Sequence, residues 1–459
     1  MISAVESIYG QLPNHWELVS VGDLVKRGKA DLQTGPFGTM LHASSYKLLG
    51  TPVVAVKHIG ENRLLHTDDL PRVDEETRQR LSRYELKVGD ILFGRKGAVE
   101  RRAIVTTQEE GWLQGSDCIR LRLLGTGISP IYISYVFGSS VYRSWIIRNA
   151  QGATMPSLNQ EIISRIPLPI PPLPEQKAIA HILGTLDDKI ELNREMNKTL
   201  EAMARAIFKS WFVDFDPVRS KMEGRQPVGM DAVTAELFPD EFEESALGMI
   251  PKGWLYQPAE TIFNVGIGKT PPRKEPEWFS TSCHDIHWVS IRDMGESGTF
   301  ISDTREYLVP EAVARFNIQI IPDHTVLLSF KLTIGRVALT DGEMTTNEAI
   351  AHFKLGSKLQ LSSEYLYLYL KTFDYSQLGS TSSIAEAVNS KIIKAMPNLI
   401  PDRDLMEQFT NQVADIFTRI KGNQRESRTL SSIRDTLLPK LLSGEIRVKE
   451  AEKVVETVL

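Results

Sequence analysis

Residues 169–212, PIPPLPEQKAIAHILGTLDDKIELNREMNKTLEAMARAIFKSWF, decide the fold of this chain. The proline-rich beginning forbids helix and then starts one, because Pro174 is tolerated in a first turn and Glu175 is favourable there. No proline follows, and apolar residues recur with a heptad-like spacing. The stretch therefore predicts a single helix of about 38 residues, which would span roughly 57 Å.

The same pattern returns at an offset of 230, half the length of the 459-residue chain. Matched positions in one continuous register include Ile162/Ile392, Pro167/Pro397, Pro171/Pro401, Asn193/Asn423 and Leu200/Leu430. The second helix is predicted to begin at a capping-box-like pair, Asp404 and Glu407, and to end at Ser443-Gly444. Two equal apolar seams in one chain most simply bury each other, which predicts an antiparallel pair of helices.

Upstream of each helix lies a body with mixed character. Residues 51–60 and 90–124 contain strand-like runs, and residues 131–148 have a helical pattern. The two bodies match each other loosely, as in residues 90–105 against residues 325–340. We therefore expect an α+β fold, in which two mixed α/β bodies, each around a curved sheet, are joined by two long antiparallel helices.

The pattern predicts five parts along the chain. They are a first body (1–170), a central helix (171–215), an acidic connector (216–249), a second body (250–400) and a C-terminal helix with its tail (401–459).

Composition excludes a mainly disordered chain and a small scaffold held together by disulfides. The chain has 53 basic and 58 acidic residues, a net charge of −5, and 42% hydrophobic residues, which is typical of a globular protein. Residues 213–249 alone carry 3 basic and 9 acidic residues, so the rest of the chain is near neutral and has room for basic surfaces. Two distant cysteines, no signal peptide and no apolar run of about 18 residues predict a cytoplasmic protein without a membrane span.

The sequence contains no complete catalytic motif. The GIGKT sequence at 266–270 resembles a phosphate-binding loop, but Phe263 stands where the first glycine is required and two prolines follow. His284 and His287 lack a neighbouring ligand cluster, so a solvated loop is the better interpretation. No methyltransferase, hydrolase or kinase motif occurs. We expect no catalytic centre, no metal and no cofactor in this chain.

Several phrases together carry a family resemblance. They are TGPFGTML (34–41), MPSLNQEIISRIPLPIPPLPEQKAIAHIL (155–183), LEAMARAIFKSWFVDFDP (200–217), GKTPPRKEPEWF (268–279), HWVSIRDM (287–294) and LLPKLLSGEI (437–446). With them the chain resembles, over nearly its whole length, the specificity subunit of type I restriction–modification enzymes. Two places depart from the family pattern: residues 96–100 replace a glycine-rich turn, and the junction before the second helix lacks its Pro-Pro-Leu phrase.

The resemblance implies a mechanism. Each body would be a target-recognition domain that reads one half-site of an asymmetric, two-part target in double-stranded DNA, and the helices would hold the bodies a fixed distance apart. The implied partners are two methylating subunits and the restriction subunits. S-adenosylmethionine, ATP and Mg²⁺ would be bound by these partners and not by this chain.

Candidate DNA contacts are basic side chains and hydroxyls on loops, because these groups bind phosphates and base edges. In the first body they are Thr34, Thr39, His42, Lys57, His58, Arg95, Lys96, Arg101 and Arg102. In the second body they are Lys269, Thr270, Arg273, Lys274, Arg292, Lys331, Thr333 and Arg336. Four large apolar residues at the ends of the helices are predicted to lie at a subunit interface, namely Trp211, Phe212, Leu441 and Leu442. For Trp211 and Phe212 the helix seam is the alternative.

Three other interpretations stay open. A self-contained nuclease or methyltransferase would need motifs that the sequence lacks. A coiled-coil adaptor would bind only protein. A specificity subunit of a methylation-only system would have the same sequence features, because the difference lies in other chains. The sequence also leaves open which bases are read and how long the spacer between the half-sites is.

Overall fold

The computed structural model describes residues 12–37, 40–152, 156–355, 361–378 and 388–458. They form two compact units. Unit one comprises residues 1–190 and 428–459, and unit two comprises residues 191–427. Among the described residues no helix is both long and apolar enough to cross a membrane.

Unit one is built on two sheets. Its five-stranded sheet has the order β2 (Ala30–Thr34), β10 (Cys118–Leu123), β7 (Ile91–Gly94), β8 (Arg102–Ile104) and β5 (Glu61–Asn62). Its four-stranded sheet has the order β3 (Tyr46–Lys47), β6 (Arg72–Val73), β4 (Thr51–Val54) and β9 (Leu113–Gln114). A separate antiparallel pair joins β1 (Glu17–Ser20) to β11 (Pro167–Ile170).

Short helices complete unit one. They are α2 (Val21–Lys26), α3 (Glu75–Arg80), α4 (Pro130–Gly138), α5 (Ser140–Asn149), α6 (Gln160–Ser164) and α16 (Val448–Glu456). The helix predicted over residues 131–148 is thus broken in two. The break occurs because Ser139 is extended and its hydroxyl accepts the N–H of Tyr142, which caps a new helix.

Unit two repeats this architecture. Its five-stranded sheet has the order β15 (Phe263–Ile267), β23 (Ile350–Leu355), β20 (Val326–Ser329), β21 (Val337–Thr340) and β18 (Phe300–Ile301). Its four-stranded sheet has the order β16 (Phe279–Ser280), β19 (Tyr307–Leu308), β17 (Ile286–Val289) and β22 (Thr345–Thr346). The separate pair is β14 (Leu255–Pro258) with β24 (Pro397–Ile400).

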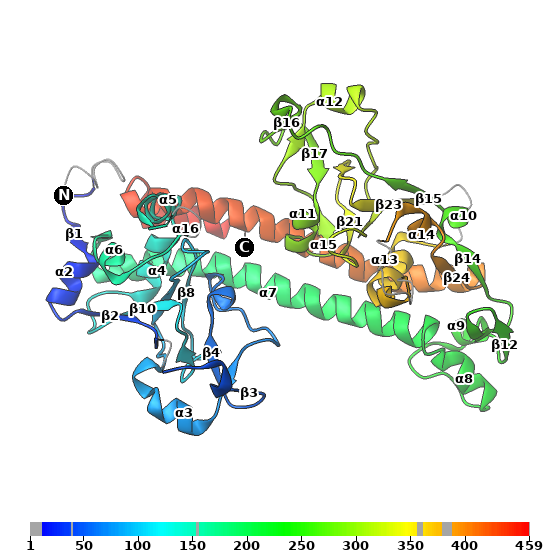
Figure 1. The fold of residues 1–459 in the computed structure, drawn as a ribbon, viewed down its shortest axis with the longest axis horizontal. Coiled ribbons are helices and arrows are strands. Elements are labelled where there is room, and N and C mark those ends of the chain that lie inside the picture. Colours follow the sequence, from blue (N-terminus) through cyan, green and yellow to red (C-terminus); the bar gives the residue numbers. More distant parts are fainter. Residues whose placement is uncertain (1–11, 38–39, 153–155, 356–360, 379–387, 459) are drawn as a thin grey trace. The chain divides into compact units, whose positions relative to one another are not determined.

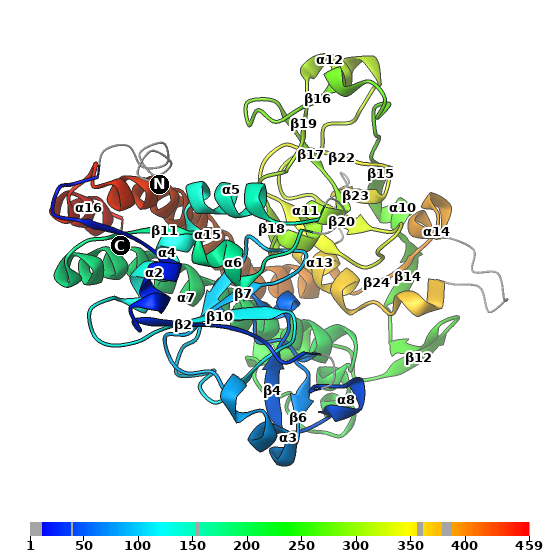
Figure 2. The ribbon, with the colours of Figure 1, turned by 60° about the vertical axis from the view of Figure 1, so that its left-hand side comes forward.

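Short helices also complete unit two. They are α8 (Asp216–Met222), α9 (Ala232–Glu236), α10 (Ala259–Ile262), α11 (Ile291–Glu296), α12 (Pro310–Arg315), α13 (Ser363–Thr372) and α14 (Ser390–Lys394). Figures 1 and 2 show α3 beside the four-stranded sheet of unit one and α12 beside the corresponding sheet of unit two. Parallel pairing occurs at the same places, β5 with β8 and β18 with β21. Strand order and direction therefore confirm the internal repeat that the sequence predicts.

Two long helices, α7 (Leu173–Phe212) and α15 (Arg403–Ser443), each contribute residues to both units (Figure 1). In unit one, Leu183 and Leu186 near the start of α7 share a core with Leu438 and Leu441 near the end of α15. In unit two the opposite ends of the helices share a core, which confirms the antiparallel pair. The left-handed Gly444, at φ 74°, follows the last residue of α15.

Buried amides bridge the two helices within unit two. The Asn193 side chain donates to Glu426 Oε2 at 2.7 Å, and the Asn423 side chain donates to Asn197 Oδ1 at 2.8 Å. Asn193 and Asn423 are almost fully buried. Because a buried amide without a partner is costly, these bonds fix the register of the pair.

The segment predicted as an acidic connector, residues 216–249, contains regular structure. It holds α8 and α9, and β12 (Phe242–Ser245) pairs with β13 (Gly248–Pro251). The bodies differ from the expected single curved sheet, because each contains a five-stranded and a four-stranded sheet.

Candidate nucleic-acid interface

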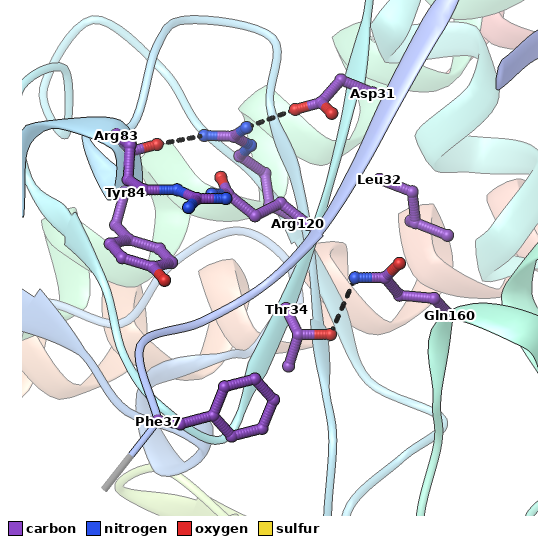
Figure 3. A pocket seen from close by; sticks show the side chains of 9 residues that line it. Asp31, Leu32, Thr34, Phe37, Arg83, Tyr84, Arg120 and Gln160 are labelled. Atoms are coloured by element: carbon purple, nitrogen blue, oxygen red, sulfur yellow. Dashed lines mark hydrogen bonds and ion pairs between the residues drawn. The ribbon is translucent and has the colours of Figure 1, made fainter. Parts of the chain in front are cut away.

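A polar cavity of about 670 Å³ opens on unit one beside β2 and β10 (Figure 3). Its lining consists of Asp31, Leu32, Gln33, Thr34, Phe37, Arg83, Tyr84, Arg120 and Gln160. These residues come from the paired strands β2 and β10, from the loop after β2, from the turn after α3 and from the start of α6. Antiparallel pairing places Gln33 opposite Arg120, so both side chains lie on the same face of the sheet.

The floor of the cavity carries buried polar groups. Arg120 is 3% exposed, and its guanidinium donates to Asp31 Oδ2 at 2.6 Å and to the Arg83 carbonyl at 3.4 Å. Burial, followed by the neighbouring Arg122, lowers the pKa of Arg120. Arg120 Nε and the Gln33 Oε1 atom are buried without a hydrogen-bond partner among the described residues. One donor and one acceptor are thus available to a ligand or to water.

The rim of the cavity is more exposed. Gln160 Nε2 donates to the Thr34 hydroxyl at 3.0 Å (Figure 3). The Phe37 ring is 57% exposed, and the Arg95 guanidinium lies 5.3 Å from its centre. The Arg83 guanidinium is exposed beside the Tyr84 ring, 5.2 Å from the ring centre.

Arginine, glutamine and threonine are the side chains that bind base edges, and exposed guanidinium groups bind phosphates. Aromatic faces with adjacent cations add surface for stacking. The cavity therefore offers both kinds of contact that a nucleic acid requires.

In unit two an imidazole occupies the position that corresponds to Gln33 and Arg120. The paired residues there are Gly266 and His352, which match Gln33 and Arg120 in strand position. His352 is fully buried, and its Nε2 lies 3.0 Å from Gln319 Oε1. A Cβ atom on Gly266 would lie 2.0 Å from His352 Nε2, so the imidazole takes the room that a side chain at 266 would need. Burial lowers the pKa of His352 to about 4, and the ring is neutral at pH 7.

The predicted contacts of unit one separate into buried and exposed groups. His58 is 1% exposed, and its Nδ1 accepts the N–H of Ala55 at 3.2 Å. Arg102 is 5% exposed and donates from Nε to the Ser134 carbonyl at 2.8 Å. Burial lowers the pKa of both side chains, that of Arg102 to about 10. These two side chains have internal roles in this conformation, which corrects the prediction that they face DNA.

The other predicted residues of unit one lie at or near the surface. Lys57 is exposed and forms an ion pair with Asp69, and Lys96 lies 3.9 Å from Asp117. His42 and Arg101 are exposed, and Thr34 and Arg95 are half-buried at the rim of the cavity. Thr39 lies outside the described residues.

In unit two, three residues of the GKTPPR phrase are held by intramolecular bonds. Lys269 Nζ donates to the Asn317 carbonyl at 2.9 Å, and Thr270 donates to Glu348. Arg273 forms two bonds with Glu306, at 2.8 and 3.0 Å. Its guanidinium also stacks on the Phe279 and Trp288 rings.

The remaining predicted residues of unit two are more accessible. Lys274, Lys331 and Thr333 are exposed, and Arg292 is exposed beside Glu296. Arg336 is half-buried, and its Nη1 donates to the Ile291 carbonyl at 2.5 Å.

The four residues predicted for a seam or a subunit interface are buried inside the chain. Trp211 and Phe212 are 4% and 5% exposed and pack on Phe409 in unit two. Leu441 and Leu442 are at most 1% exposed in the core of unit one. For Trp211 and Phe212 this burial fits the seam alternative. For all four residues it corrects the predicted subunit interface, because their side chains offer almost no surface to another protein.

Sequence analysis missed six polar residues of the cavity, namely Asp31, Gln33, Arg83, Tyr84, Arg120 and Gln160. A usable signal existed for Arg120, because strand Cys118–Leu123 alternates apolar and basic residues and an inward arginine on such a strand needs a partner. No group of three metal-ligating residues occurs within the described parts of the chain.

Comparisons with known proteins agree over both units. The family model described as "Type I restriction modification DNA specificity domain" matches residues 13–202 and 251–412. The Type I restriction enzyme HindI specificity subunit of Haemophilus influenzae is 30% identical over 66% of this chain and 73% of its own length. The MjaIX specificity subunit of Methanocaldococcus jannaschii is 27% identical over 71% of each chain.

A solved structure shares the fold. The crystal structure of a type I restriction–modification S subunit from M. genitalium has a TM-score of 0.52 at 14% identity. The match covers 94% of this chain and 97% of the other.

Proposed function

Because the chain belongs to the family of type I restriction–modification DNA specificity subunits, we propose that it reads an asymmetric, two-part DNA target. The recognition bodies of this proposal are residues 1–170 and 250–400. Each body reads one half-site, and α7 with α15 sets the spacing between them. A role on cellular DNA calls for a cytoplasmic location.

The observation that carries the asymmetry is the difference between matched strand positions. Gln33 and Arg120 line an open cavity in unit one, whereas Gly266 and His352 form a closed contact in unit two. Base recognition depends on which donors and acceptors face the groove. Two bodies of equal topology with different polar groups therefore favour two different half-sites.

The proposal assigns chemistry to partner chains. Two methylating subunits supply S-adenosylmethionine, and restriction subunits supply the ATP- and Mg²⁺-dependent steps. Trp211, Phe212, Leu441 and Leu442 are buried inside the chain. The proposal therefore assigns the binding of these subunits to the exposed faces of the long helices and their flanking segments. Two alternatives remain as outcomes of the test: a subunit of a methylation-only system and an adaptor that binds only protein.

The deciding experiment maps methylated bases in the DNA of cells that express this chain with its methylating subunit. The control cells lack only this chain. We expect a two-part asymmetric motif that depends on the chain. A soluble complex that adds no motif would contradict the DNA-reading role and favour the adaptor.

A second step separates the other alternative. Adding the restriction subunit and ATP to DNA that carries the unmethylated motif leads to cleavage in a restriction–modification system. Absence of cleavage by a restriction subunit that is active with another specificity subunit would indicate a methylation-only system.

A further inference from the structure

The turn between β20 and β21 in unit two carries an apolar residue at its tip. Leu332 is 98% exposed, and its φ of 62° lies in the left-handed region, where a leucine is strained. The N–H of Thr333 donates to the Lys331 carbonyl at 2.7 Å, which centres a tight three-residue turn on Leu332. A leucine so exposed contributes nothing to the core of unit two.

The base of this turn is rigid. Ser329 is fully buried, and its hydroxyl donates to the Thr333 carbonyl at 2.6 Å and accepts the Arg336 N–H at 3.1 Å. The buried Phe330 donates its N–H to the Ala349 carbonyl at 3.0 Å. Backbone strain persists only where the surroundings fix the conformation. These hydrogen bonds therefore fix the turn in a conformation that points Leu332 into solvent.

Basic side chains lie on this turn and near its base. Lys331 is exposed and forms no ion pair with any described residue. The bond from Arg336 to the Ile291 carbonyl brings the start of α11, with the exposed Arg292, to the base of the turn. Cations around an apolar tip fit a DNA duplex, because its phosphates are anionic and the faces of its base pairs are apolar.

Unit one shows that the backbone does not require a leucine here. The matching position in the turn between β7 and β8 is Gly97, which has a similar φ of 78°. Glycine adopts this conformation without strain. A Cβ atom on Gly97 would meet no atom within 4 Å, so the fold of unit one leaves room for a side chain at this position. What unit two adds at this position is the side chain itself.

We propose that Leu332 is a wedge that inserts between two adjacent base pairs of the half-site bound by unit two. Unit one binds its half-site without such a wedge. The inference rests on the proposed function, because it requires the chain to bind DNA. Insertion buries the leucine, unstacks one base step and kinks the duplex. Because base steps differ in how easily they unstack, the wedge adds sequence preference without a hydrogen bond.

The test uses the complex of the full chain with its methylating subunits and a duplex that carries the mapped target. The fluorescent base 2-aminopurine replaces each base of the two half-sites in turn. We expect the wild-type complex to raise its fluorescence at one step of one half-site. The variants L332G and L332N should abolish that rise and weaken binding about 10-fold or more, the worth of burying a leucine side chain.

These variants also separate a wedge from a structural role. Glycine and asparagine tolerate the left-handed conformation, so the melting temperature of the chain should stay equal or rise. A mismatch at the responsive step, which weakens its stacking in advance, should tighten wild-type binding and leave the variants unchanged. V228N is the matched control, because Val228 is 91% exposed in the acidic segment 216–249.

Three results would overturn the inference. One is an unchanged affinity and fluorescence in L332G. Another is a loss of affinity on replacing thymine by uracil without any 2-aminopurine response, which would indicate contact with a methyl group. A wild-type complex that binds no specific DNA would instead remove the proposed function as a whole.

Discussion

Unit one and unit two have the same strand order, yet the matched pairs in their central sheets differ in chemistry. Unit one places Gln33 opposite Arg120 and leaves a cavity beside them. Unit two places Gly266 opposite His352 and closes the same place with Gln319. The strand order is thus the same in both units, while the side chains at these matched positions offer different polar groups. Such a scaffold can change the polar groups that it offers to a ligand by substitution without changing its fold.

The largest expected effect concerns the aromatic core of unit two. F212A should lower the free energy of unfolding of unit two by about 3–5 kcal/mol, because it removes a buried ring that packs on Tyr365 and Phe409. L441A is the matched variant for the core of unit one. Hydrogen exchange, followed separately for each unit, should show each variant loosening its own unit. If F212A left the stability unchanged but the chain no longer bound its methylating subunit, the predicted subunit interface would be right.

The next effect concerns the buried imidazole of His352 in unit two. The pKa of His352, lowered to about 4 by burial, lies below its unfolded value, so the unfolded chain takes up the proton first as the pH falls. The free energy of unfolding should therefore fall by about 2–3 kcal/mol between pH 6.5 and pH 4. H352Q keeps a donor toward Gln319 and should remove this part of the pH dependence in denaturant titrations. Equal slopes for both proteins would contradict the assignment.

A third effect tests how tightly the closed contact is packed. G266A should cost about 2 kcal/mol, since its Cβ would lie 2.0 Å from His352 Nε2. The double variant G266A/H352A should cost less than the sum of the two single variants. In unit one, Q33A should have little effect on stability because Gln33 borders an open cavity. Additive costs in unit two would show that the two residues are not coupled.

The smallest effect concerns base discrimination. If unit one reads a half-site as proposed, R83A should relax discrimination at one base of that half-site by about 10-fold, near 1.4 kcal/mol, and leave the other half-site unchanged. Methylation mapping of cells with this variant measures the change. R225A, in the acidic segment beside Glu223, is the control. A uniform loss of methylation at all targets would instead indicate a phosphate contact.

The long helices could be predicted because their signals are local. Prolines mark where α7 starts, and glycine marks where α15 ends. The repeat of apolar residues then identifies the buried face without knowledge of the rest of the fold. The α+β class followed in the same way, from the alternation of strand-like and helical runs.

The cavity could not be predicted, since its residues meet only through strand pairing and loop contacts. Gln33 and Arg120 become neighbours by an antiparallel register that the sequence does not display. His58 and Arg102 were misplaced for a related reason. Residue type alone places charged and polar side chains at the surface, whereas in the fold these two are buried and form internal hydrogen bonds.

The division of the chain also has a consequence for its synthesis. Unit one depends on residues 428–459, which supply buried leucines to its core, namely Leu430, Leu437, Leu438, Leu441 and Leu442. At about 5–20 residues per second, the ribosome needs roughly 10–50 seconds to make residues 191–427 before it reaches them.

Throughout that interval the apolar face of α7 with Leu183, Leu186 and Ile190 lacks its partner. Unit two, although it comes second in the sequence, is the first whose residues are all present. The two units can therefore be completed in the reverse of the order in which they begin. Until residues 428–459 are made, the apolar face of α7 in unit one must be kept from aggregating.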